Sequence, residues 1–197
     1  MKTCLAAVAV MAAAFSAPAL AATGLDCLDT GYTTEEQATF AGFEAGFSFV
    51  AFQNEEQSEK MLEPLNPALG RRAEVCMAQH GWSEKAMEQA LFHKISGLLL
   101  AAIDRNTVLT PQLHGKLRAF AANGDQARLR RVFAPMVNRA NAAQADPDQA
   151  KADAEYFVGQ LITDGFNPDD TTSLEYVGAW FGAKYGAELA AEQFAKE

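Results

Sequence analysis

The chain has 197 residues, of which 49% are hydrophobic and 21% charged, and its formal net charge is −9 at pH 7. A chain of this length suits a single domain that buries a sizeable core. Its acidity makes nucleic acid a poor candidate partner, because the phosphate backbone attracts basic surfaces.

The first residues predict an export signal. Lys2 gives a positive start, an apolar run follows over residues 5–14, and residues 19–21 read Ala-Leu-Ala, a suitable cleavage site. The apolar run is too short to span a bilayer, which takes about 20 residues. We therefore expect residues 1–21 to be cleaved as a signal peptide and residues 22–197 to form one helical domain, periplasmic or secreted, without a membrane span. An uncleaved membrane anchor is the alternative.

Two of the three cysteines, Cys27 and Cys76, remain after such cleavage. An even number of cysteines in an oxidising compartment predicts one disulfide. Closing the loop between them would restrict the unfolded chain and stabilise the fold by about 4 kcal/mol. Two buried thiols are the alternative. The sequence has no Cys-x-x-Cys motif, which argues against an oxidoreductase.

Apolar residues recur with the helical period along nearly the whole domain, and no segment is typical of a strand. Start and stop signals divide this pattern into about seven helices, which predicts an irregular all-α, single-domain bundle. The first helix opens at a capping box that begins with Thr33 and runs to about Glu63, just before the first of two prolines. A short second helix is expected to end at His80. The others are expected from Ser83 to about Asp104, from Thr110 to Asn123, from Asp125 onward, from Asp146 to about Asp164, and from a cap at Thr172 or Ser173 onward.

Two of the expected helices carry glycines four residues apart. A glycine inside a helix costs about 1 kcal/mol relative to alanine, so these repeats call for a reason. Without a Cβ atom, a helix lets a second backbone approach closely. We interpret the glycines as sites of close helix packing within the chain, between these two helices themselves, and a homodimer built on the last helix is the alternative. The residues are Gly42 and Gly46 in the first helix and Gly178, Gly182 and Gly186 in the last.

Charge is distributed unevenly along the chain. Residues 22–104 carry 5 basic and 13 acidic side chains, residues 105–139 carry 7 and 1, and residues 140–197 carry 3 and 11. The middle segment, called the basic block below, predicts either a surface that binds an anion or an acidic partner, or ion pairs with the protein's own acidic helices. The candidate binding residues project from the helix after Asp125, away from its apolar face, and are Arg128, Arg130, Arg131 and Arg139.

The sequence contains no familiar motif for nucleophilic catalysis or phosphate binding. Its three histidines, His80, His93 and His114, form no pair with the spacing of metal ligands, so we predict neither a metal nor a cofactor. His93 is interpreted as a partly buried structural residue. A metal site gathered from several helices is beyond what spacing can test.

These observations favour an exported, non-enzymatic helical protein that binds an envelope protein or an anionic envelope component, with the arginines as its binding face. The alternative is a periplasmic enzyme acting on an anionic substrate, in which His93 or His114 would converge with a carboxylate and an arginine in a pocket. A heme or metal carrier is a third hypothesis, which requires neighbouring ligands that the sequence does not assemble.

Overall fold

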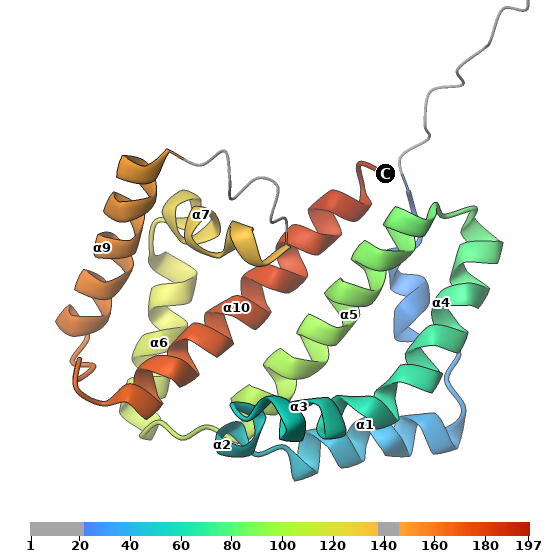
Figure 1. Cartoon of the computed structure of the whole chain (residues 1–197), viewed down its shortest axis with the longest axis horizontal. Coiled ribbons are helices and arrows are strands. Elements are labelled where there is room, and N and C mark those ends of the chain that lie inside the picture. Colours follow the sequence, from blue (N-terminus) through green and yellow to red (C-terminus); the bar gives the residue numbers. More distant parts are fainter. Residues whose placement is uncertain (1–21, 138–145) are drawn as a thin grey trace, which may run out of the picture.

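The structure, a computed structural model, describes residues 22–137 and 146–197, and all regular elements of that part of the chain are helical (Figure 1). The predicted all-α fold with one disulfide is confirmed. Residues 1–21, the predicted signal peptide, lie outside the described residues, and so does Arg139. Within the described part, no helix is long and apolar enough to cross a bilayer.

Most helices begin and end where the sequence predicts. The capping box forms at Thr33, whose side chain accepts a hydrogen bond from the N–H of Glu36, and the Glu36 carboxylate accepts one in return. Gly81 ends a helix in the left-handed conformation, at φ 68°. The elements are η1 (Leu25–Asp29), α1 (Thr34–Gly46), α2 (Phe49–Phe52), α3 (Glu55–Leu62), η2 (Glu63–Leu65), α4 (Asn66–His80), α5 (Glu84–Arg105), α6 (Pro111–Asn123), α7 (Gln126–Val137), α9 (Pro147–Thr163) and α10 (Thr171–Phe194).

The single helix expected from Thr33 to about Glu63 is wrong, because this segment forms α1, α2 and α3. Phe47 is extended, and the side chains of Ser48 and Asn54 cap the two helices that follow. The apolar period continues across Ser48 and concealed its cap, whereas Asn54 lies in a polar stretch that is also compatible with a helix interior. As a result the chain turns back, and α3 lies along α1 with a groove between them.

The cap expected at Thr172 or Ser173 is also displaced. Helix α10 begins at Thr171, and the Asp170 carboxylate caps it by accepting a hydrogen bond from the backbone N–H of Ser173. The aspartate competes successfully for this position because its ionised oxygen is a stronger acceptor than a hydroxyl.

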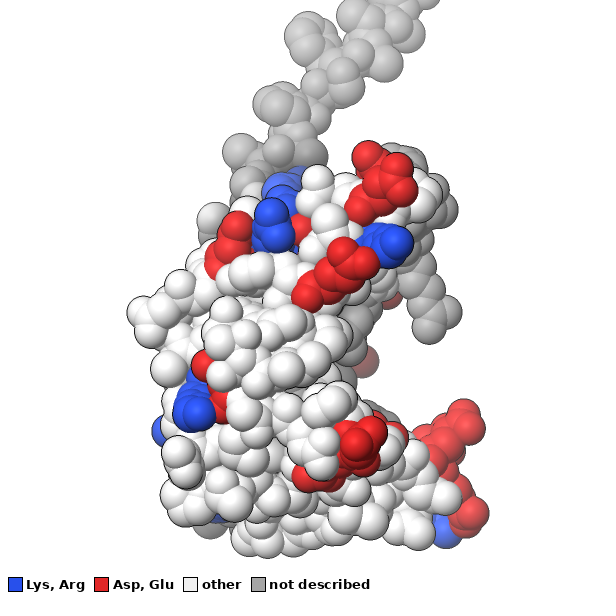
Figure 2. All heavy atoms as spheres, turned by 90° about the vertical axis from the view of Figure 1, so that its left-hand side faces the viewer, with Lys and Arg blue, Asp and Glu red and all other residues white. Residues whose placement is uncertain are grey.

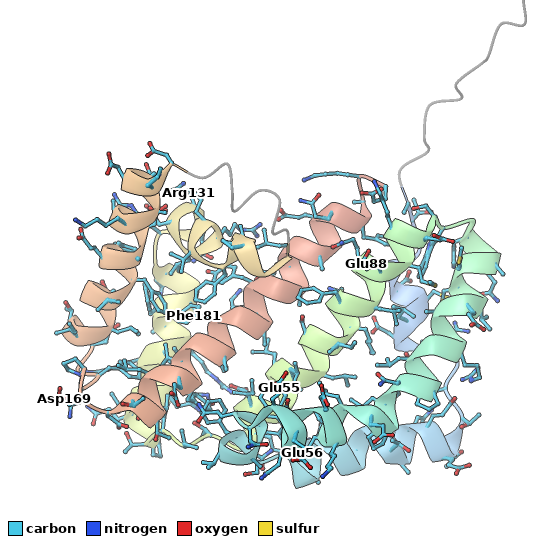
Figure 3. All side chains as sticks on the ribbon, in the orientation of Figure 1. Glu55, Glu56, Glu88, Arg131, Asp169 and Phe181 are labelled. Carbon is cyan, nitrogen blue, oxygen red and sulfur yellow. A yellow bond between two sulfur atoms is a disulfide. The ribbon has the colours of Figure 1, made fainter. Side chains whose placement is uncertain are left out.

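Helix α10 crosses the middle of the fold, with α5 along one side and α7 packed against it (Figure 1). Its Phe181 is fully buried and is the centre of an aromatic cluster (Figure 3). The ring centroids of Phe120 on α6, Phe133 on α7 and Phe157 on α9 lie 5.4, 5.7 and 5.2 Å from that of Phe181. This cluster joins α6, α7, α9 and α10.

A disulfide and hydrogen bonds hold the N-terminal segment against α4 and the turn between α4 and α5. Cys27 and Cys76 form the predicted disulfide, with their Cα atoms 5.9 Å apart. The indole N–H of Trp82 donates to the carbonyl of Thr23 at 2.8 Å. The guanidinium of Arg72 donates to the carbonyl of Cys27 at 2.9 Å. These contacts hold η1 against a second, smaller apolar core.

Candidate functional site

The arginines of α7 bind carboxylates of the neighbouring helices. Arg131 forms two hydrogen bonds to Asp153 of α9, Nε to Oδ2 at 2.6 Å and Nη2 to Oδ1 at 3.0 Å. The hydrogen bond from Arg131 holds the pKa of Asp153 below its usual value, although burial opposes this shift. Arg130 pairs with Glu188 and Glu192 of α10. Helix α7 is thereby tied to both α9 and α10.

Arg128 also faces acidic groups, although less closely. Its Nε lies 3.6 Å from a carboxylate oxygen of Asp125 and 3.9 Å from one of Asp153. Its guanidinium lies over the ring of Tyr156, 5.1 Å from the centroid. All three described arginines of the candidate binding face therefore have carboxylate neighbours, as the ion-pair interpretation expects, and their role in binding a partner stays a prediction.

The same pattern extends to two further arginines of the basic block. Arg105 at the end of α5 pairs with Glu44 of α1 at 3.2 Å. Arg118 of α6 pairs with Asp104 of α5. The acidic partners come from the segments on both sides of the block. The alternation of charge along the sequence therefore corresponds to ion pairs between helices in the fold.

A second polar cluster forms where α5, α6 and α10 meet. The Nε2 atom of His114 lies 2.8 Å from Oδ1 of Asp104, and the indole N–H of Trp180 donates to the same oxygen at 3.1 Å. Arg118 binds the other oxygen of this carboxylate. Burial alone would raise the pKa of Asp104, but the hydrogen bonds from Trp180, Arg118 and His114 lower it below its usual value.

This cluster brings together a histidine, a carboxylate and an arginine, the combination that the enzyme hypothesis requires. The sequence identified His114 but not Asp104 or Trp180, because the three residues come from different helices and share no spacing. His93 lies apart from the cluster, with Nδ1 2.8 Å from the carbonyl oxygen of Ala187, and it links α5 to α10. Over the residues that the structure describes, no group of three or more potential ligands is placed to hold a metal ion.

Gly186 of α10 meets α5, whereas the sequence pattern favoured the first helix as the partner of the α10 glycines. A Cβ atom added at Gly186 would lie 3.1 Å from Oγ of Ser96 and 3.4 Å from the ring of Phe92. The close approach of α10 and α5 therefore depends on glycine at this position. Gly182 is also buried in α10. In contrast, a Cβ atom at Gly178 would meet nothing within 4 Å.

The two glycines of α1 face an open groove. A Cβ atom at Gly42 or Gly46 would meet nothing within 4 Å, so neither glycine serves a close contact within the described fold. The groove has a volume of about 310 Å³ and separates α1 from α3. Its lining residues are Thr39, Gly42, Phe43 and Gly46 of α1 and Lys60, Met61 and Pro64 from α3 and η2.

An acidic groove adjoins the first one and shares Lys60 with it. Its volume is about 580 Å³, and its lining includes Glu56, Glu59 and Glu63. Every residue of α3 is exposed or half-buried, so this helix stands on the surface of the bundle. Figure 2 shows acidic side chains projecting from the lower right corner of the molecule, the side on which α3 lies.

Comparison with known proteins gives no relative for this chain: no family model, no curated protein and no solved structure matches it. The function is therefore argued from the geometry of these sites.

Proposed function

We propose that this protein is exported to the bacterial envelope and binds another envelope protein there, without acting as an enzyme. The observation that carries the proposal is the bare surface of α1 at Gly42 and Gly46. A glycine inside a helix costs about 1 kcal/mol relative to alanine, and here the part of the fold that the structure describes gains no close contact in return. A second molecule that packs against the bare backbone accounts for glycine at both positions.

Two features support a place outside the cytoplasm. The N-terminal sequence is typical of a signal peptide, and the disulfide between Cys27 and Cys76 belongs to an oxidising compartment. If the chain is cleaved after residue 21, its second remaining residue, Thr23, is still held to the fold by the hydrogen bond from the Trp82 indole to its carbonyl.

The groove supports binding more strongly than the arginines of α7 do. A ligand at Arg131 would compete with Asp153, a carboxylate that is 1% exposed and accepts two hydrogen bonds from this arginine. A ligand in the groove displaces only water. We therefore place the main contact on α1 and α3.

Crosslinking in intact cells, followed by purification of a tagged full-length chain, tests the proposal. The informative variant is Gly42→Leu, which fills the groove, and its matched control is Gly159→Leu on α9, where a Cβ atom also meets nothing within 4 Å. We expect a partner that wild type and the control capture and that Gly42→Leu loses. If wild type captures no protein at all, the proposal is wrong.

The cluster around His114 favours a second function, an enzyme that acts on an anionic substrate. The Asp104 carboxylate orients His114, and Arg118 lies beside it, which is a suitable arrangement for a general base next to an anion-binding group. Turnover of a phosphate monoester by wild type, lost in a folded His114→Gln variant, would support this function. If wild type turns over none of a panel of anionic esters, the enzyme hypothesis is wrong and the cluster serves to link α5, α6 and α10.

A further inference from the structure

We propose that the groove between α1 and α3 binds a basic, amphipathic helix of a partner protein. The inference rests on the proposed binding function and names the chemistry of the partner. It is carried by the apolar lining of the groove, by the acidic side chains along its α3 side, and by the lack of internal partners for most of those acids among the described residues.

The floor of the groove suits an apolar helix face. Phe43 is buried beneath it, while Met61 and Pro64 form the opposite wall. Gly42 and Gly46 are both exposed and leave the backbone of α1 uncovered between these walls. A helix that lays leucine-like side chains against such a surface can bring its own axis unusually close to α1.

Acidic side chains flank the groove, next to the Lys60 that lines it. Glu56 and Glu59 of α3 and Glu63 of η2 line the adjoining groove, and Glu35 is exposed near the start of α1, one helical turn before Thr39. Figure 3 shows Glu55 and Glu56 at the start of α3, on the front of the molecule. A partner helix that enters the groove therefore meets negative charge along its polar flank.

These glutamates are available to a partner, unlike most acids near the basic block. In the described ranges, the one ion pair that α3 makes is between Lys60 and Glu56, at 2.6 Å, and both side chains are mostly exposed. By contrast, Asp153, Glu188 and Glu192 are each bound to an arginine. The charge left over on α3 complements lysine or arginine on the approaching helix.

The same charge argues against other occupants. An anionic lipid surface or a nucleic acid would be repelled by the α3 glutamates. A second copy of this chain is a poor match, because Arg105, Arg118 and Arg130 are already paired with its own carboxylates. A basic segment of another protein satisfies both the apolar floor and the acidic side chains that flank the groove.

Titration of the mature chain with a fluorescent helical peptide tests the inference. The peptide consists of leucine and lysine arranged with one apolar face, and its two controls are the same composition in scrambled order and a leucine–glutamate helix. We expect the protein to bind the leucine–lysine helix and neither control peptide. The affinity for this helix should fall about tenfold or more in Gly42→Leu and in the triple variant E56Q/E59Q/E63Q. Affinity should also fall as salt increases.

Two matched variants control for folding and for net charge. Gly159→Leu adds the same side chain to α9, and D148N/D169N/E175Q removes the same charge from exposed positions on other elements. Both should bind the peptide as wild type does. Circular dichroism must show that all variants keep the wild-type helix content. Equal weakening by the control variants, or unchanged binding by Gly42→Leu, overturns the groove as the site.

Photo-crosslinking in cells separates this inference from the proposed function. One strain carries a photoreactive residue at position 42, and a second strain carries it at position 159. The residue is activated in cells, and the crosslinked peptides are sequenced. A basic amphipathic segment of another protein at position 42 supports the inference. A crosslinked segment of neutral or acidic character, a second copy of this chain, or capture only at position 159 overturns the inference but leaves the binding function. No crosslinked protein from either position contradicts both.

Discussion

Arg131 and Asp153 form a two-point ion pair between α7 and α9 in which the carboxylate is almost fully enclosed and the arginine is not. The Asp153 side chain is 1% exposed, whereas that of Arg131 is 48% exposed. Gln149 adds a third hydrogen bond to the carboxylate at 2.9 Å. Since a buried charge is costly without its partner, this pair adds to the aromatic contacts that hold α9 against α7.

Replacing Arg131 by alanine should therefore destabilise the protein clearly, and more than Arg128→Ala does. The first change removes both short hydrogen bonds to Asp153, whereas the second removes longer contacts of 3.6 and 3.9 Å and a ring contact. Urea unfolding of the two variants and wild type provides the comparison. Equal unfolding midpoints for all three would show that the pair contributes nothing to stability.

Acid should weaken the fold over a defined range of pH. The pKa of Asp153 and that of Asp104 are lowered in the fold, and hydrogen bonding to Arg71 and the backbone of Thr33 lowers the pKa of Glu36 to about 2. Groups of this kind bind protons more readily in the unfolded chain, so their stabilisation is complete above the unfolded pKa of about 4. It is then lost as the pH falls towards the folded value.

We expect the free energy of unfolding to be nearly constant from pH 7 to about 5 and to decline below about pH 4. The variant Asp153→Asn should be less stable at pH 7 and should lose less stability on acidification. Denaturant titrations at a series of pH values measure both effects. A wild-type stability that rises on acidification would contradict the assigned direction of these shifts.

The disulfide should supply a large part of the stability of the mature chain. Removing it through the double variant Cys27→Ser/Cys76→Ser releases a loop that spans a sequence separation of 49 residues, at a cost of about 4 kcal/mol in the loop-entropy model. Chemical denaturation of the variant and wild type tests this value. As a direct check of the bond, unfolded and unreduced mature protein should contain no thiol that can be alkylated.

Alanine should have opposite effects at two helical glycines. At Gly42 a methyl group meets open space, so Gly42→Ala should stabilise the protein by up to about 1 kcal/mol through helix propensity. At Gly186 the methyl group would press on Ser96 and Phe92, so Gly186→Ala should lower stability. Thermal or urea unfolding distinguishes them, and an equal gain at both positions would contradict the close contact between α10 and α5.

Local signals in the sequence were sufficient for most helix boundaries. Thr33, Ser83 and Thr110 each cap a helix with a side-chain oxygen, and this depends only on residues within one turn. The break at Ser48 was missed because apolar residues on both sides continue the helical period, and the break at Asn54 was missed because the polar residues after it are also compatible with a helix. A serine or asparagine inside such a pattern is compatible with both a cap and a helix interior.

The candidate sites depended on contacts that no spacing reveals. The basic block suggested ion pairs, but the partner of Arg130 lies on α10, about 60 positions away in sequence. Asp104 and Trp180 come together with His114 only because α5, α6 and α10 converge. The groove likewise exists because α3 turns back along α1, which follows from the two caps at Ser48 and Asn54.

The position of α10 has a consequence for the order in which the fold can form. This helix carries the centre of the aromatic cluster, yet it comes after α5, α6, α7 and α9 in the sequence. Until residues 171–194 are available, α5, α6 and α7 lack the surface on which they pack, and the core stays incomplete. Because α10 follows α5, α6 and α7 in the sequence, the aromatic core can be completed only when this helix has docked against them.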